Sequence, residues 1–485
     1  MMRKAKSNQA IFLAIFCTTV LLCATTLFGQ TFTTLANFEG TNGGEPESSL
    51  VQGRDGALYG TASYGGDTRD CNGGCGTAFR ITTGGTLTDL RLKPADGSVP
   101  AGMVLASDGK FYGTAILGGA NSWGTVFRIG PAGAFDVLYT FCAQPDCIDG
   151  AEPVGTLITA TNGNLYGTTA AGGTVHCSSH NTGCGTVYSI TRQGQLTVLH
   201  NFCSEPNCTD GEYPEAGLLE GTDGNFYGTT YSEDSRNSLG TVFKITPNGK
   251  LTTIHTFNGT DGSLPTGTLI QATDGNLYGT TTGGCGTVYK IEPSGAFSNL
   301  YVFCSGGNCG DGCSLYSGVI QGTDGNLYGT TNEGGANGTG TVFELTLSGT
   351  LTTLYSFADM GSPFGGPDGG LVQATNGIFY GTTSLGGDLS CEKYGCGTVF
   401  SLDTGLAPFV TFVQKAGKTG RTAQILGQGL TRTTSVSFNG VPATFSVESD
   451  TFLIATVPTG ATSGYVTVTT PSGVLTSNVP FTVIP

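Results

Sequence analysis

Short runs of apolar, aromatic and β-branched residues alternate with Gly, Asn, Asp and Pro along most of the chain. Such runs between turn-forming residues are typical of β-strands. In the stretch 267–303 four of them follow one another, at 267–273, 276–281, 286–291 and 296–303. Asp274-Gly275 separates the first two and is a signal for a two-residue hairpin turn. The pattern therefore predicts units of four short antiparallel strands.

One nine-residue stretch, TDGNLYGTT or a close variant, occurs seven times. Its tyrosines lie 50 to 61 residues apart, at Tyr59, Tyr112, Tyr166, Tyr227, Tyr278, Tyr328 and Tyr380. A period of this length indicates a solenoid or a β-propeller. Because radial repetition leaves only short exposed strand edges, we predict an all-β, seven-bladed β-propeller with four strands per blade at residues 31–405. An open β-solenoid is the alternative.

The two ends of the repeat region favour the propeller. Residues 31–38, TFTTLANF, have the pattern of a fourth strand, yet they precede the first complete unit. The last unit has a third strand at 397–402 and is followed by Pro408, which lacks a backbone donor and fits poorly inside a strand. We therefore expect residues 31–38 to complete the last blade and close the ring.

The N-terminus is typical of an export signal. Arg3, Lys4 and Lys6 precede an apolar run from Ala10 to Ala24. We predict a signal peptide at residues 1–30, a secreted or cell-surface protein, and no membrane span after cleavage. An uncleaved anchor is the alternative, although the apolar run is short for a complete span.

The cysteine pattern agrees with export. Fourteen cysteines lie beyond the predicted signal, and an even, paired set is typical of disulfides in an oxidising compartment. The expected pairs are Cys71–Cys75, Cys142–Cys147, Cys177–Cys184, Cys203–Cys208, Cys304–Cys309 and Cys391–Cys396, with Cys285 left to join Cys313. Zinc binding is the competing interpretation, but no pair has the CxxC spacing of a structural zinc site.

Composition narrows the range of functions. The formal net charge is -15, so neither nucleic acid nor an anionic membrane is expected as a partner. The chain has no GxSxG, HExxH or phosphate-binding glycine loop, and we assign no catalytic residue. His200 and His255 are expected to pack within fourth strands. His176 and His180 flank Cys177, where a metal site is the alternative to a plain disulfide loop.

The run DGNLYGTT…GG…GTVFKIT…LTTLYSF resembles the GloVer repeat of exported bacterial proteins, a family named by its repeats and not by a known activity. Residues 409–485 resemble an IPT/TIG domain in the stretches AQILGQGL (423–430), VSFNGVPATF (436–445) and GYVTVTTPSG (464–473). This second resemblance implies an immunoglobulin-like β-sandwich at residues 406–485, a module that occurs in cell-surface proteins.

Two rows of polar residues are candidate sites. The loops between units carry a D-G-x-x-P pattern, whose acids could ring the channel mouth and bind calcium or could form turns before a proline. These acids are Asp96, Asp149, Asp210 and Asp261, together with Asp311, whose copy keeps the Asp and loses the Pro. The first strands carry a polar row that could line a hydrated channel or could be structural: Gln52, Glu220, Gln271, Gln321 and Gln373. Apart from calcium, no cofactor is expected.

The loops of variable length hold all fourteen of these cysteines and share one face of the predicted propeller. Binding residues concentrate on variable loops held by a rigid scaffold. We therefore expect a monomeric, non-catalytic binding or adhesion protein with a carbohydrate or a surface protein as its partner. The alternatives are an enzyme of the propeller lyase or lactonase kind with a metal at the channel mouth, and a passive structural repeat protein.

Overall fold

The computed structural model describes residues 29–66, 74–177, 182–232, 239–358, 365–391 and 393–484. Almost all regular structure in these ranges is β-strand. The helices among these residues are four 3-10 turns: Pro94–Asp96, Pro145–Cys147, Pro206–Cys208 and Leu430–Arg432. None of the helices in the described ranges has the length and apolar character needed to cross a membrane. The predicted signal peptide lies outside the described residues except for its last two positions.

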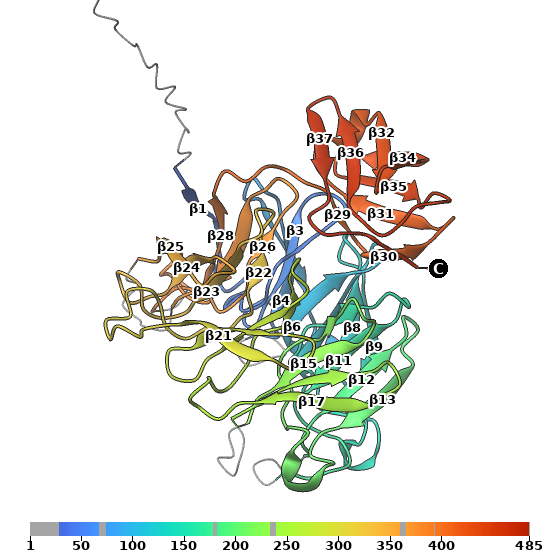
Figure 1. The fold of residues 1–485 in the computed structure, drawn as a ribbon. Helices are drawn as coiled ribbons and strands as arrows, with labels where there is room; N and C mark the ends of the chain where they lie inside the picture. Colours follow the sequence, from blue (N-terminus) through green and yellow to red (C-terminus); the bar gives the residue numbers. More distant parts are fainter. Residues whose placement is uncertain are drawn as a thin grey trace, which may run out of the picture.

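The described residues between Gln30 and Leu406 form seven four-stranded antiparallel sheets that resemble propeller blades (Figure 1). We number them sheets 1 to 7. Sheet 1 contains β2 (Val51–Gln52), β3 (Leu58–Ala62), β4 (Thr77–Ile81) and β5 (Leu87–Arg91). Sheet 2 contains β6 (Ser98–Leu105), β7 (Phe111–Leu117), β8 (Thr125–Ile129) and β9 (Phe135–Thr140). Sheet 3 contains β10 (Ile158–Thr159), β11 (Leu165–Thr169), β12 (Thr186–Ile190) and β13 (Leu196–Asn201). Sheet 4 contains β14 (Leu219–Glu220), β15 (Phe226–Thr230), β16 (Thr241–Ile245) and β17 (Leu251–Thr256). Sheet 5 contains β18 (Ile270–Gln271), β19 (Leu277–Thr281), β20 (Thr287–Ile291) and β21 (Phe297–Val302). Sheet 6 contains β22 (Ile320–Gln321), β23 (Leu327–Thr331), β24 (Thr341–Leu345) and β25 (Leu351–Ser356).

Sheet 7 joins the two ends of the repeat region. It contains β26 (Val372–Gln373), β27 (Phe379–Thr383), β28 (Thr398–Asp403) and β1 (Thr31–Asn37). β1 pairs antiparallel with β28, with Thr31 opposite Asp403. The pairing confirms the prediction that residues 31–38 supply the fourth strand of the last unit.

In six of the seven sheets the first strand has only two residues and is shorter than its sequence predicts, whereas β6 of sheet 2 has eight. In sheet 5 the run 267–273 contributes only Ile270–Gln271 to β18. Before it the chain lies between β19 and the next sheet: a Cβ on Gly267 would meet the Thr280 hydroxyl of β19 and would lie 2.6 Å from the Gly318 nitrogen of sheet 6. The close approach of the next sheet's backbone at Gly267 accompanies the end of the regular strand pairing.

The repeated nine residues form a hairpin and supply the tyrosine that binds to its turn. In sheet 4 the Asp223 carboxylate accepts a hydrogen bond from the Tyr227 hydroxyl at 2.9 Å, and Tyr227 is 2% exposed. The glycine after the tyrosine leaves room for an aromatic ring on the third strand, because a Cβ on Gly228 would lie 2.5 Å from the Phe243 ring. The Tyr–Asp contact recurs in sheets 1, 2, 5 and 6, while in sheets 3 and 7 an asparagine at the same position donates to the tyrosine hydroxyl. The contacts explain why Asp or Asn, Tyr and Gly are repeated together.

Residues 409–484 form a second all-β unit, which we call the C-terminal module. One of its sheets has the strand order β29-β31-β35-β34 and the other β33-β32-β36-β37, while β30 and β38 pair in parallel. The strands are β29 (Thr411–Phe412), β30 (Ala416–Lys418), β31 (Thr422–Leu426), β32 (Ser435–Phe438), β33 (Val441–Ala443), β34 (Phe445–Ser449), β35 (Phe452–Thr456), β36 (Val466–Thr470), β37 (Gly473–Thr476) and β38 (Thr482–Ile484). Both sheets contribute to one apolar core, with Ile425 and Leu453 from the first and Val436 and Val468 from the second.

Candidate functional site

A cavity of about 410 Å³ lies between the seven sheets, and each sheet contributes to its lining. The lining residues are mainly those that lead into the first strand of each sheet. Glycines such as Gly155, Gly217 and Gly318 line it, so backbone rather than large side chains forms much of the wall. The volume falls in the range of small-molecule binding sites.

One position of the repeat supplies a cavity-lining side chain in every sheet. It follows the loop proline, or Leu315 in sheet 6. The seven residues are Glu47, Ala101, Val154, Glu215, Thr266, Tyr316 and Asp368. We call them the mouth residues, because they lie where the disulfide-bearing loops meet the cavity. Sequence reasoning missed them, although a variable residue beside a recurring proline was the available signal.

Two of the mouth acids belong to neighbouring sheets 7 and 1. Asn332 Nδ2 donates to Asp368 Oδ1 at 2.6 Å, and Ser63 Oγ donates to Glu47 Oε2 at 2.9 Å. Burial raises the pKa of Asp368 to about 7, and the negative charges of Glu47 and Glu45 add to the shift. Burial also raises the pKa of Glu47. Asp368 is therefore partly protonated near neutral pH, and its carboxyl group can donate as well as accept a hydrogen bond.

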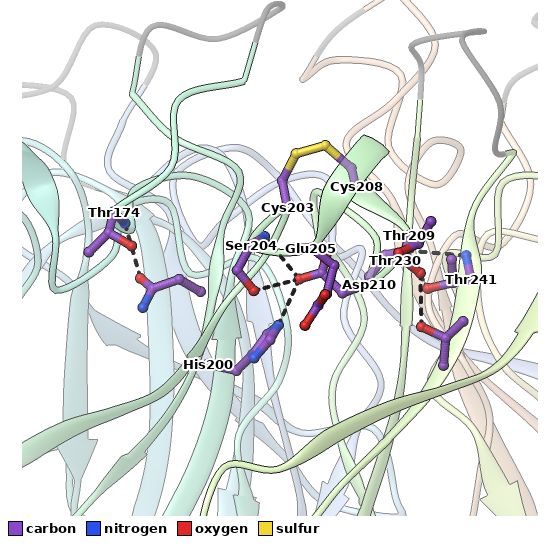
Figure 2. A network of polar contacts seen from close by, with 12 residues as sticks. Thr174, His200, Cys203, Ser204, Glu205, Cys208, Thr209, Asp210, Thr230 and Thr241 are labelled. Carbon is purple, nitrogen blue, oxygen red and sulfur yellow. Dashed lines mark hydrogen bonds and ion pairs between the residues drawn. A yellow bond between two sulfur atoms is a disulfide. The ribbon is translucent and has the colours of Figure 1, made fainter.

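Asp210, one of the loop acids predicted to ring the channel, points toward donors of its own loop (Figure 2). Asp210 is 2% exposed, and its carboxylate accepts hydrogen bonds from the backbone nitrogens of Ser204 at 3.0 Å and Glu205 at 3.3 Å. His200 Nε2 lies 3.0 Å from Asp210 Oδ2. Burial by itself raises the pKa of Asp210, but the hydrogen bonds from His200 and Ser204 outweigh it and leave this pKa below its usual value.

The other four acids make similar contacts with nearby donors. Asp149 accepts from the Tyr139 hydroxyl and Ala143 N, Asp261 from Asn258 N, Asp311 from the Tyr301 hydroxyl and Cys304 N, and Asp96 from Lys93 N. In the first copy the neutral amide of Asn42 accepts from Glu39 N in the same manner. An amide serves there as well as a carboxylate, so these contacts favour the turn interpretation, while calcium binding stays a prediction.

The polar row of the first strands links neighbouring sheets. At five junctions between described sheets, the side chain at this position accepts a hydrogen bond from the backbone nitrogen of a threonine in the hairpin turn of the preceding sheet. The pairs are Gln52 with Thr375, Glu220 with Thr161, Gln271 with Thr222, Gln321 with Thr273, and Gln373 with Thr323. We call these contacts the turn clamps. None of the five polar side chains is among the residues that line the cavity described above.

Replacing one clamp residue should weaken the ring measurably. Gln321 accepts from Thr273 N at 2.9 Å and donates to Gly325 O at 2.8 Å. We expect Gln321→Ala to lower the free energy of unfolding by about 1 kcal/mol in chemical denaturation. Thr159→Ala is the matched control at the same position of sheet 3, because Thr159 Oγ1 is buried without a partner. Equal losses in the two variants would contradict the clamp.

The disulfides crosslink the loops on the face that carries the mouth residues. The structure contains Cys142–Cys147, Cys177–Cys184, Cys203–Cys208, Cys285–Cys313, Cys304–Cys309 and Cys391–Cys396, as predicted. Cys71 and His180 lie outside the described residues, and His176 is exposed. Among the described residues, the groups close enough to share a metal ion consist of these bonded cysteines and Glu212. His255 packs in β17 against Phe297, with ring centroids 4.0 Å apart.

The comparisons with known proteins give a family but no activity. A proposed oxidoreductase (glucose dehydrogenase) of Thermus thermophilus is 13% identical with a TM-score of 0.41, over 77% of this chain and 100% of that one. A luciferin-regenerating enzyme is 11% identical with a TM-score of 0.39, over 79% of this chain and 98% of that one. No curated protein matches the chain. The Gloeobacter/Verrucomicrobia repeat matches residues 21–179, 69–285 and 281–432, and the chain therefore belongs to that family.

Proposed function

We propose that this protein is an exported binding protein whose seven sheets are the blades of one closed β-propeller. The β1–β28 pairing and the Gln52–Thr375 clamp between sheets 1 and 7 support closure of the ring. The C-terminal module is then an immunoglobulin-like sandwich of the IPT/TIG kind, supported by its two four-stranded sheets around one core. The disulfides support an oxidising, extracellular location.

The observation that carries the proposal is the cavity and its ring of mouth residues. Glu47, Glu215 and Asp368 offer carboxylate oxygens to it, and Tyr316 lies at its mouth with 46% of its surface exposed. Sugar hydroxyls donate to carboxylates, and a sugar ring can lie against an exposed aromatic side chain. A carbohydrate chain end is therefore the proposed ligand. Disulfides beside the mouth reduce the ordering entropy that binding would cost.

A second candidate function is favoured by one observation, the Asp368–Glu47 pair. A carboxyl group with a pKa of about 7 beside another carboxyl group is suited to general acid–base catalysis near neutral pH. An enzyme of the propeller lyase or lactonase kind would place this pair at the cavity mouth, with a metal ion among the surrounding oxygens.

A thermal-shift screen of residues 31–485 tests the proposal. The oxidised protein is measured with a panel of polysaccharides, with calcium and with EDTA, because a ligand that binds only the folded state raises the melting temperature. We expect one saccharide class to raise it, and Tyr316→Ala to abolish the shift. Tyr465→Ala is the matched control, since Tyr465 is 44% exposed on the C-terminal module.

The remaining outcomes separate the alternatives. A shift with calcium that EDTA reverses, without any saccharide effect, would replace the binding proposal by the metal-dependent enzyme. No shift with any compound would favour a structural repeat protein. A saccharide-induced rise in melting temperature that persists in Tyr316→Ala would show that the saccharide binds elsewhere than at the mouth residues.

A further inference from the structure

Two disulfides meet in the loop that leads from sheet 5 to sheet 6. Cys304–Cys309 closes a short loop just after β21, and Cys285–Cys313 joins the β19–β20 connection to the residues that follow this loop. The sulfur atoms of Cys285 and Cys309, which belong to different disulfides, lie 3.8 Å apart. The Cys313 sulfur lies within 4.8 Å of both. The two disulfides are therefore in direct contact through their sulfur atoms.

An equivalent arrangement occurs in sheet 3. Cys203–Cys208 occupies the same positions after β13, and Figure 2 shows it in the loop that also contains Asp210. The Cys203 sulfur lies within 4.8 Å of the sulfurs of Cys177 and Cys184, which form the neighbouring disulfide. Contact between two disulfides therefore occurs in two copies of the repeat.

A third loop has the same short disulfide without a neighbouring one. Cys142–Cys147 follows β9 with the same spacing. Trp123 and Ala151 stand at the two positions where the second disulfide of sheet 5 has its cysteines. Both residues pack in the apolar cluster that contains Cys147. The chain thus supplies its own control, a loop of the same kind beside a tryptophan instead of a disulfide.

The short disulfide of sheet 5 is strained and accessible. Cys304 and Cys309 have φ angles of 56° and 45°, in the left-handed region that residues with a side chain rarely adopt. Residues 305–308 between them are exposed, whereas Cys313 is 8% exposed. A strained, accessible disulfide is reduced more readily than a buried one. An external reductant should therefore open Cys304–Cys309 before Cys285–Cys313.

We propose that these four cysteines form a thiol–disulfide relay, in which the reduction of Cys304–Cys309 by an external dithiol is passed on to Cys313. In the first step the dithiol is oxidised to its own disulfide, and Cys304 and Cys309 become thiols. In the second step Cys309 loses its proton and its thiolate attacks the Cys285 sulfur. The Cys285–Cys309 bond forms, the Cys285–Cys313 bond breaks, and the Cys313 sulfur leaves with the electron pair and takes up a proton. This exchange needs no further electron donor.

Opening the short disulfide provides the movement that the second step needs. A thiolate attacks a disulfide along the axis of the sulfur–sulfur bond. Cys309 Sγ lies beside the Cys285–Cys313 bond, because it is within 4.8 Å of both sulfurs of that bond. Once its own bond is broken, the exposed loop 305–308 is free to shift and Cys309 can reach the axis. Cys304 is outside this group of mutually close sulfurs, so Cys309 is the attacking residue.

The relay changes how the mouth residue Tyr316 is held. Cys313 precedes Tyr316 by three residues, and its bond to Cys285 ties their segment to the β19–β20 connection. The backbone hydrogen bonds of Cys313 with Glu333 do not depend on that bond. After the exchange the segment stays paired with sheet 6 and loses its covalent link to sheet 5. An effect on saccharide binding rests on the proposed function, whereas the relay rests on sulfur positions and can be tested without a ligand.

Limited reduction of the oxidised chain 31–485 tests the relay. The protein is treated with a limiting amount of dithiothreitol, free thiols are trapped with N-ethylmaleimide, and peptides are mapped by mass spectrometry without further reduction. We expect a peptide pair joined by Cys285–Cys309, with the label on Cys304 and Cys313. The loop after β9 should give only labelled thiols. Labelled Cys304 and Cys309 beside an intact Cys285–Cys313 bond, with no Cys285–Cys309 product, would overturn the proposal.

A pair of variants tests the exchange without any reductant. Cys304→Ser leaves Cys309 as a free thiol, and the folded variant should contain Cys285–Cys309. Cys309→Ser is the matched control, because it frees Cys304 instead, and its Cys285–Cys313 bond should be exchanged at least about tenfold less. Equal exchange in the two variants would contradict the relay. The reduction experiment needs no substitution and decides the question if a variant does not fold. A saccharide screen without a hit would refute the proposed ligand, while the exchange products would still decide the relay.

Discussion

Replacing Asp210 by alanine is expected to lower the free energy of unfolding by about 3 kcal/mol. The carboxylate is 2% exposed and accepts hydrogen bonds from Ser204 N, Glu205 N and the Ser204 hydroxyl. His200 would also lose its partner. Removing a buried acceptor leaves these donors without a partner. The free-energy cost of the unpaired donors exceeds the net stabilisation that the hydrogen bonds provide. Urea unfolding followed by circular dichroism measures the effect.

Glu205→Ala is the matched control for this experiment. Glu205 lies in the same loop, carries the same charge and is exposed, so its loss should change stability by less than about 0.5 kcal/mol. The measurement is repeated with calcium and with EDTA. If calcium stabilises the unaltered protein and Asp210→Ala removes that stabilisation, Asp210 is a metal ligand and not a turn residue.

Asp368→Asn should stabilise the protein at pH 8 by about 2 to 4 kcal/mol and leave its stability nearly unchanged at pH 4. In the folded chain burial raises the pKa of Asp368 from 3.8 to about 7. Between these values the folded state holds a proton that the unfolded state has released. Stability therefore falls as the pH rises through this window, and an asparagine, which has no charge to bury, avoids that loss. The measurement is thermal unfolding across this pH range.

Glu205→Gln provides the control, because it removes an exposed carboxylate and should alter stability little at either pH. A change in stability with Asp368→Asn that is the same at pH 4 and pH 8 would show that Asp368 is not the titrating group. Destabilisation at pH 8 would mean that the ionised carboxylate is favoured in the folded state. Either result would also remove the basis for acid–base catalysis at the mouth.

Much of the fold could be predicted from local sequence patterns. The strand runs, the hairpin turns and the seven tyrosines predicted four-stranded units, because strand formation and turn chemistry depend on neighbouring residues. The isolated run at 31–38 predicted its own partner, β28. Five of the six described disulfides followed from short spacings, which bring two sulfurs together whatever the rest of the chain does. The sixth, Cys285–Cys313, spans 28 residues and followed because these were the two cysteines left over.

The candidate site was predictable only in part. The loops that carry it were identified, but the residues were not: Asp149 and Asp210 turn back to their own loops, and Gln321 binds the preceding turn. A polar residue that recurs in every copy can equally serve the repeat itself. For four of the five acids a tyrosine or histidine of the preceding strand, such as Tyr139 or His200, was the available sign that the acid already had a partner.

The sequence by itself determined an all-β repeat chain with local disulfides and a strand that joins its two ends, since each of these depends on contacts between residues close in sequence or on one repeated pattern. Only the tertiary structure decided which side chains meet at the centre, where Glu47 and Asp368 come from opposite ends of the repeat region. It also decided that Arg54 and Leu105 serve the C-terminal module. Those contacts join residues more than 300 positions apart; Arg54 and Gln424, for example, are separated by 370 positions. A local sequence pattern contains no information about which distant surfaces will meet.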